Sequence, residues 1–157
     1  MLLATYLNDH LAGATAGREL ARRAAGNNRG SELGDFLEGL AREIDQDRES
    51  LIELMHALGV GIDRTKVLGG WAAEKIGRLK PNGKLLGYSP LSRLLELEGL
   101  TLGVRGKLAL WVALKEIDAN EPGLASIDLT DLAVRAERQL AALEPHRLAI
   151  VEDALAR

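Results

Sequence analysis

The sequence of 157 residues contains no cysteine and few aromatic residues: two Trp, two Tyr and one Phe. The absence of cysteine excludes disulfides, thiolate metal ligands and a cysteine nucleophile. Leu and Ala are abundant by contrast. A chain rich in these residues and poor in aromatics is typical of packed helices rather than of a β-sandwich.

Long apolar runs and a strong charge bias are also lacking. No run of about 18 apolar residues is present that could span a membrane, and the N-terminal residues lack the basic region and apolar run of a signal peptide. The net charge of −3 gives no general reason to expect nucleic-acid binding. We therefore expect a cytoplasmic protein with a single helical-bundle domain over residues 1–157.

The most apolar stretch, residues 89–120, is predicted to form the central helix of a bundle. Ser89 followed by Pro90 is a helix start, because the hydroxyl caps free N–H groups and the proline ring presets φ. No further proline occurs before Pro122. At about 100° per residue, the Leu, Val and Trp side chains point almost all the way round the axis. Most sides of this helix must therefore be buried.

Four other helices are predicted from apolar residues at three- and four-residue spacing. Residues 2–25 form the first and residues 31–58 the second, and the short loop between them makes the two antiparallel. Residues 63–79 form a shorter helix. Residues 128–155 form the last one, with a bend at Pro145.

About 30 residues separate the second predicted helix from the central one, and only the helix of residues 63–79 lies between them. This connector is long enough to run the length of a bundle, as the single crossover of ferritin-like folds does. The expected fold is all-α: a ferritin-like four-helix bundle with a long crossover that carries a short extra helix. An up-and-down bundle with residues 63–79 as a partial fifth member is the alternative.

Two groups of glycines at helical spacing predict close helix packing: Gly13 and Gly17 in the first helix, and Gly99, Gly103 and Gly106 in the central one. A glycine inside a helix costs about 1 kcal/mol relative to alanine, so repeated glycines on one side suggest a close approach of two backbones. In the crossover topology these two helices run antiparallel, and Gly17 then lies level with Gly103 to Gly106.

The order of the helices resembles that of the ferritin-like superfamily over nearly the whole chain. The resemblance implies a di-iron or di-manganese centre, with a Glu on each of two helices and Glu-x-x-His on the other two. This sequence has one such motif, Glu53-Leu54-Met55-His56, whose Glu and His point roughly 150° away from the apolar side of their helix. Glu144-Pro145-His146 has the wrong spacing for neighbouring ligands. We therefore expect no metal cofactor; an Fe or Mn site is the alternative.

Two polar residues are predicted to face each other inside the first hairpin. His10 lies on the apolar side of the first helix, and Asp47 interrupts the apolar stripe of the second. In an antiparallel hairpin with a loop of this length, the two residues lie opposite each other. The carboxylate would then raise the pKa of the imidazole. We interpret the pair as fixing helix register; a site for one metal ion at His10 and Asp47 is the alternative.

A second buried polar pair is predicted between the last two helices. Arg147 lies among apolar positions of the last helix, and Glu98 of the central helix is at nearly its level, so a bidentate ion pair is expected. No Ser, Thr or Lys stands beside His10 and Asp47 to act as a nucleophile, and no catalytic residue is predicted.

The connector is strongly basic, with six Lys and Arg between positions 63 and 84 against two acidic residues. A basic amphipathic helix of this kind can dock on an anionic lipid or protein surface. In the more ordinary arrangement its Trp packs on the bundle and its lysines stay in water, so membrane binding is not expected. The candidate interaction surface consists of Arg64, Lys66, Trp71, Lys75, Arg78 and Lys80.

The functional hypothesis is a non-catalytic, ferritin-like structural or protein-interaction protein. A homodimer is expected, because four neighbours can hardly cover all the large apolar residues of the central helix. The first alternative is a divergent metal-binding protein or oxidoreductase, and the second is a peripheral protein that binds anionic lipid through residues 63–79. The apolar residues on which the prediction of a dimer rests are Leu95, Leu100, Leu110, Trp111 and Leu114.

Overall fold

The computed structural model describes residues 2–69, 87–117, 120–125 and 127–156, and every regular element within these ranges is helical. The all-α prediction is confirmed for this part of the chain, in which no helix is both long and apolar enough to cross a membrane. Residues 64–69 are helical, and the rest of the predicted 63–79 helix lies outside the described residues. The other elements are α1 (Leu2–Asn27), α2 (Glu32–Ala57), α4 (Pro90–Ile117), η2 (Pro122–Leu124), α5 (Leu129–Ala149) and α6 (Val151–Leu155).

Side-chain caps explain where three of the long helices begin. Ser31 Oγ and Ser89 Oγ each accept a hydrogen bond, at 3.1 Å, from the backbone N–H three residues further on. The Asp128 carboxylate does the same at 2.9 Å. Each cap satisfies a backbone donor that has no partner within its helix. The predicted helix starts at these three residues are confirmed.

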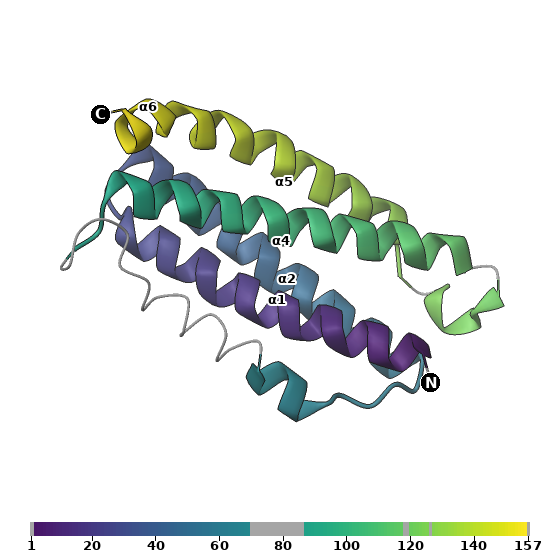
Figure 1. Cartoon of the computed structure of the whole chain (residues 1–157). Coiled ribbons are helices and arrows are strands. Elements are labelled where there is room, and N and C mark those ends of the chain that lie inside the picture. Colours follow the sequence, from purple (N-terminus) through teal and green to yellow (C-terminus); the bar gives the residue numbers. More distant parts are fainter. Residues whose placement is uncertain (1, 70–86, 118–119, 126, 157) are drawn as a thin grey trace.

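The helices run in the directions that the crossover topology requires. The end of α1 meets the start of α4, where Arg23 Nε donates to Glu96 Oε1 at 3.0 Å and Asn28 Nδ2 donates to Tyr88 Oη at 2.8 Å. Helices α1 and α4 are therefore antiparallel, and α2 and α4 run in the same direction (Figure 1). As predicted, α2 ends at one end of the bundle and α4 begins at the other.

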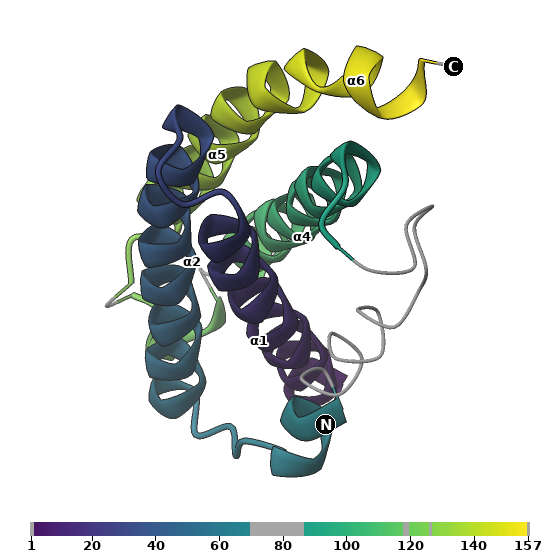
Figure 2. The same ribbon diagram turned by 90° about the vertical axis from the view of Figure 1, so that its left-hand side faces the viewer.

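The four long helices close into a ring. Helix α1 packs against α2 and α4, and α4 packs against α5 (Figure 2). The ring closes between α2 and α5, where the rings of Phe36 and His146 stack with their centroids 4.3 Å apart. Further along the same pair, Arg138 Nη2 lies 3.0 Å from Glu43 Oε1. Since residue 36 meets 146 and residue 43 meets 138, α2 and α5 are also antiparallel.

The predicted last helix is divided in two. Helix α5 continues through Pro145 and ends at Ala149, and α6 follows from Val151. Pro145 has no N–H to give to the helical ladder, and five residues later the N–H of Ile150 bonds to the Leu148 carbonyl instead of continuing the ladder. The interruption therefore lies at Ile150, five residues beyond the predicted bend at Pro145.

The core is a continuous cluster of mainly Leu and Ala side chains from all four helices. Helix α4 has one buried side and one exposed side, which carries Leu95, Leu102 and Val112, so it is not buried on most sides as its sequence predicts. Leu100, Leu110, Trp111 and Leu114 are all buried, so the prediction that four neighbours leave them uncovered is wrong. Of the residues that prompted the dimer, only Leu95 is exposed, at 43 %.

Candidate functional site

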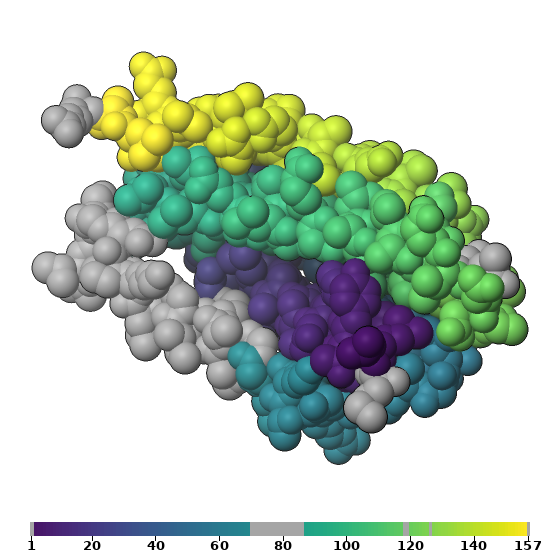
Figure 3. All heavy atoms as spheres, turned by 45° about the vertical axis from the view of Figure 1, so that its right-hand side comes forward, coloured from purple at the N-terminus to yellow at the C-terminus, as the bar shows by residue number. Residues whose placement is uncertain are grey.

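A cavity of about 440 Å³ lies between α1, α2 and α4. Figure 3 shows the surface hollowed between α1 (purple) and α4 (green). Small-molecule sites in proteins typically have volumes of roughly 300 to 1,000 Å³ and apolar walls with a few polar groups. This cavity is the candidate functional site. Its apolar wall consists of Ile44, Leu51, Leu100, Val104, Leu110 and Trp111.

Four glycines form the part of the wall where α1 and α4 face each other: Gly13 and Gly17 from α1, and Gly103 and Gly106 from α4. A Cβ atom built on any of them would meet no other atom within 4 Å. The predicted close packing of the two backbones at these positions is therefore wrong. The glycines are level with one another as expected, but they leave space between the helices instead of closing it.

Gly99 differs from the other glycines of α4. A Cβ there would lie 2.9 Å from Cδ2 of Leu20 on α1. The two helices are therefore close at this level, one turn from the cavity, and the contact is with a side chain rather than with the other backbone. Gly99 is thus the one position at which the predicted close approach of α1 and α4 is supported, and the contact there is with a side chain.

His10 and Asp47 both line the cavity, but they do not pair with each other. The His10 ring contacts the edge of the Tyr6 ring, with centroids 4.5 Å apart. Burial lowers the pKa of His10, and the nearby charge of Asp9 opposes this shift only in part. The predicted increase in the pKa of His10 is therefore wrong, because the carboxylate expected to cause it has other partners.

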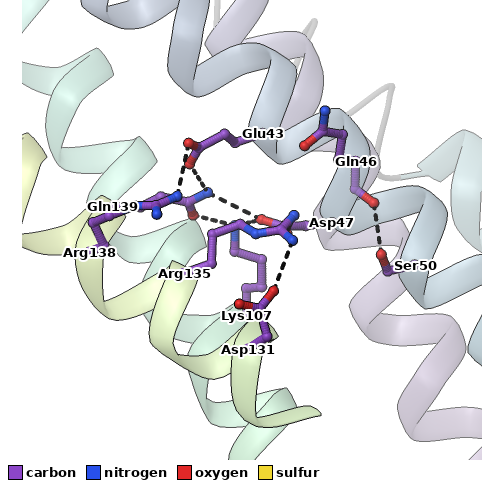
Figure 4. Close-up of polar contacts among 9 residues, drawn as sticks. All are labelled: Glu43, Gln46, Asp47, Ser50, Lys107, Asp131, Arg135, Arg138 and Gln139. Carbon is purple, nitrogen blue, oxygen red and sulfur yellow. Dashed lines mark hydrogen bonds and ion pairs between the residues drawn. The ribbon is translucent and has the colours of Figure 1, made fainter. Parts of the chain in front are cut away.

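Asp47 is the centre of a buried ionic cluster that joins three helices (Figure 4). Its side chain is 1 % exposed. Lys107 of α4 donates to Oδ2, and Arg135 of α5 donates to Oδ1 at 3.0 Å. Gln139 Nε2 donates to Oδ2 at 3.3 Å. The prediction that Asp47 points inward is confirmed, whereas its predicted partner is wrong.

Gln139 connects this cluster to the outer surface of the α2–α5 contact. Its Nε2 donates to Glu43 Oε2 at 2.8 Å, and its Oε1 accepts from Lys107 Nζ at 2.5 Å. Arg135 also bonds to Asp131 at 3.2 Å. Burial lowers the pKa of the Lys107 ammonium, although the charge of Asp47 opposes the shift. The cluster keeps a buried carboxylate paired on both oxygens, as burial of a charge requires.

Lys107 and Gln139 were missed by the sequence analysis, although a signal was present. Lys107 falls between Val104 and Trp111 on the inward side of α4, and Gln139 falls between Ala136 and Leu143 on the inward side of α5. A polar residue at a core position of each helix indicates partners inside the bundle.

The predicted bidentate pair of Glu98 and Arg147 is also wrong. Arg147 makes its two short bonds to Glu144, three residues earlier on α5, at 2.8 and 2.7 Å. Arg147 Nη1 lies 3.9 Å from Glu98 Oε1, and the Glu98 side chain is 43 % exposed. Residues three apart on a helix are neighbours on its surface, so the local carboxylate competes successfully with the one on α4.

The mononuclear metal site at His10 and Asp47 is not supported, because both oxygens of Asp47 accept hydrogen bonds from cationic or amide groups. Within the described ranges, no three His, Cys, Asp or Glu side chains are grouped so that they could hold an ion. Glu53 and His56 are exposed on the outer side of α2, as their positions on the helix predict.

The candidate interaction surface of the connector is described only at its start. Arg64 is exposed, and Lys66 Nζ lies 2.7 Å from Asp9 Oδ1, which ties the connector to α1. The other four members of this surface, namely Trp71, Lys75, Arg78 and Lys80, lie outside the described residues.

Comparison of the chain with family models, with curated proteins and with solved structures gives no match.

Proposed function

We propose that this protein is a non-catalytic helical-bundle protein that binds a small, largely apolar molecule in the cavity between α1, α2 and α4. The cavity has the size and the mainly apolar wall of a ligand site. Its polar side chains are Tyr6, Asp9 and His10 from α1, Asp47 and Arg48 from α2, and Lys107 from α4.

The observation that carries this proposal is the set of open glycines. Gly13, Gly17, Gly103 and Gly106 lie inside long helices, where each costs about 1 kcal/mol relative to alanine. None is required by a turn or by close packing, since an added Cβ would meet nothing within 4 Å. Their shared effect is to keep space open between α1 and α4. Binding of a ligand in that space would offset the lost helix stability.

Filling the cavity from its glycine wall tests the proposal. The probe is phenylnaphthylamine, a neutral apolar fluorophore whose emission rises in an apolar site. The wild-type protein is expected to bind it saturably with one site per chain. The double substitution Gly17→Leu with Gly106→Leu places two apolar side chains in the cavity and should weaken binding at least tenfold.

The matched control is Gly39→Leu. Gly39 is also inside a helix, an added Cβ there also meets nothing within 4 Å, and the residue does not line the cavity. Binding should remain unchanged in this variant. Unsaturable binding to the wild type, or equal binding to the filled and control variants, would contradict the proposal.

The helix order supports a finer proposal, that the bundle is ferritin-like. Helices α1 and α4 are antiparallel, α2 and α4 are parallel, and the connector joins opposite ends of the bundle. These are the directions found in four-helix bundles with one long crossover. A protein of this kind without paired Glu-x-x-His motifs is proposed to act by binding rather than by redox chemistry.

A homodimer is proposed as the second element of function, on a specific observation. The outer side of α4 exposes three large apolar residues, Leu95 at 43 %, Leu102 at 72 % and Val112 at 47 %. Glu98 and Arg105 lie on the same side, between them in sequence. An exposed apolar stripe interrupted by opposite charges is typical of a helix that pairs with a second copy.

A further inference from the structure

Two cationic side chains of the cavity wall, Lys107 and Arg48, have more N–H groups than acceptors bonded to them. Lys107 Nζ has three N–H groups. Its partners among the described residues are two, Asp47 and Gln139. Arg48 has five N–H groups. Its Nε donates to Thr15 Oγ1 at 3.3 Å, and its Nη1 donates to Glu49 Oε1 at 2.9 Å.

The acceptor oxygens of Asp47 and Thr15 next to these cations are already engaged. Both oxygens of Asp47 accept bonds, from Arg135 on one side and from Lys107 and Gln139 on the other. Thr15 Oγ1 donates to the Leu11 carbonyl at 2.9 Å and accepts from Arg48. At Asp47, Arg48 and Lys107 the remaining hydrogen-bonding capacity is therefore that of cationic donors. The other polar side chains of the wall, Tyr6, Asp9 and His10, come from α1, and Asp9 Oδ1 pairs with Lys66 Nζ at 2.7 Å.

The two cations lie near the same level of the bundle. Arg48 is the next residue after Asp47 on α2, and Asp47 bonds directly to Lys107 on α4. Both side chains line the cavity, and each is 15 % exposed. They are thus held by the fold and only partly hydrated, the condition under which a charge-assisted hydrogen bond is strong.

We propose that the cavity binds a small apolar carboxylic acid as its anion, with the carboxylate held by Lys107 and Arg48. The apolar body then lies against Ile44, Leu100 and Val104. This inference rests on the proposed function, because it names the class of molecule that the same cavity takes. The carboxylate is a planar double acceptor, and it matches the fork of an arginine and the point charge of a lysine.

The test compares decanoate with decanol, which have the same chain and differ in the head group. Each is titrated as a competitor of phenylnaphthylamine. The wild-type protein should bind decanoate at least tenfold more tightly than decanol. In Arg48→Gln this preference should fall to less than threefold, while the affinity for decanol stays unchanged.

The matched control is Arg42→Gln, which makes the same charge change on the same helix. Arg42 is exposed and does not line the cavity, so the preference for decanoate should persist. Equal binding of acid and alcohol to the wild type, or an undiminished preference in Arg48→Gln, would overturn the inference and leave the proposed function standing. Failure of both competitors to displace the fluorophore, with no saturable binding of the fluorophore itself, would overturn both.

Discussion

At the scale of single residues, the polar positions inside the bundle decide its properties. Asp47 was identified from the sequence because it interrupts an apolar stripe, and its burial is confirmed. Its partners could not be identified in the same way. They come from α4 and α5, and their levels depend on how the two hairpins are placed against each other. The loop of a hairpin fixes which residues of its two helices lie opposite each other. No such loop fixes how two hairpins are aligned when they pack together.

Removal of the Asp47 carboxylate should destabilise the protein strongly. Asp47→Ala leaves Lys107 without its ionic partner in a buried site, and a broken buried pair typically costs about 3 to 5 kcal/mol. Urea unfolding followed by circular dichroism measures the loss. Asp45→Ala is the matched control, because Asp45 is on the same helix, is 32 % exposed and pairs at the surface with Arg22. It should cost about 1 kcal/mol or less.

The double variant Asp47→Ala with Lys107→Met should recover part of the stability lost in Asp47→Ala, since it removes the unpaired charge as well. Additive losses in the double variant would show that the pair is not coupled.

His10 is expected to titrate below its ordinary pKa of 6.5, because burial disfavours its charged form. A lowered folded-state pKa means that His10 contributes stability above pH 6.5 that is lost as the pH falls through the folded-state pKa. Proton NMR of the imidazole resonances measures the midpoint, and His10→Gln identifies the resonance. A midpoint above 6.5 would revive the view that a carboxylate holds this ring in its charged form.

At the scale of helices, the sequence was informative. The caps at Ser31, Ser89 and Asp128 and the apolar spacing of the long helices predicted their starts, because both signals are local. The glycines on α1 and α4 were placed at the correct level but given the wrong role. Glycine repeats show that one side of a helix has no side chains. This is compatible either with close packing of a second helix or with an open cavity.

The hairpin between α1 and α2 contains a glycine that does lie in close contact. A Cβ at Gly34 would be 2.1 Å from the backbone oxygen of Asn28, whereas one at Gly39 would meet nothing within 4 Å. Gly34→Ala should therefore lower the free energy of unfolding, because a backbone atom must move. Gly39→Ala should raise it by up to about 1 kcal/mol through helix propensity. Chemical denaturation of the two variants measures both changes, and equal effects would contradict this reading of the turn.

At the scale of the whole molecule, the two-hairpin arrangement followed from the length of the connector. The expectation of uncovered apolar surface on α4 was correct for Leu95 and wrong for Leu100, Leu110, Trp111 and Leu114. A helical wheel gives the direction of each side chain, but it does not show on which sides of the helix the neighbouring helices pack. Leu100, Leu110 and Leu114 face such neighbours, and Leu102 does not.

An antiparallel pairing of two α4 helices would place Leu102 near the twofold axis and Glu98 near Arg105 of the second copy. Glu98→Arg should then weaken the dimer, and the double charge exchange Glu98→Arg with Arg105→Glu should restore it. Sedimentation at tens of micromolar protein measures the association. Leu148→Glu is a control on the exposed surface of α5 and should leave it unchanged. A wild-type protein that sediments as a monomer would contradict the dimer.

The antiparallel arrangement of every neighbouring pair in the ring has an electrostatic consequence. Each long helix carries a macrodipole, roughly half a positive charge at its N-terminus and half a negative charge at its C-terminus. With two helices starting at each end of the bundle, these partial charges offset one another. An anion that approaches between α1 and α4 therefore meets almost no axial field, and its position along the bundle is set by ionised side chains alone.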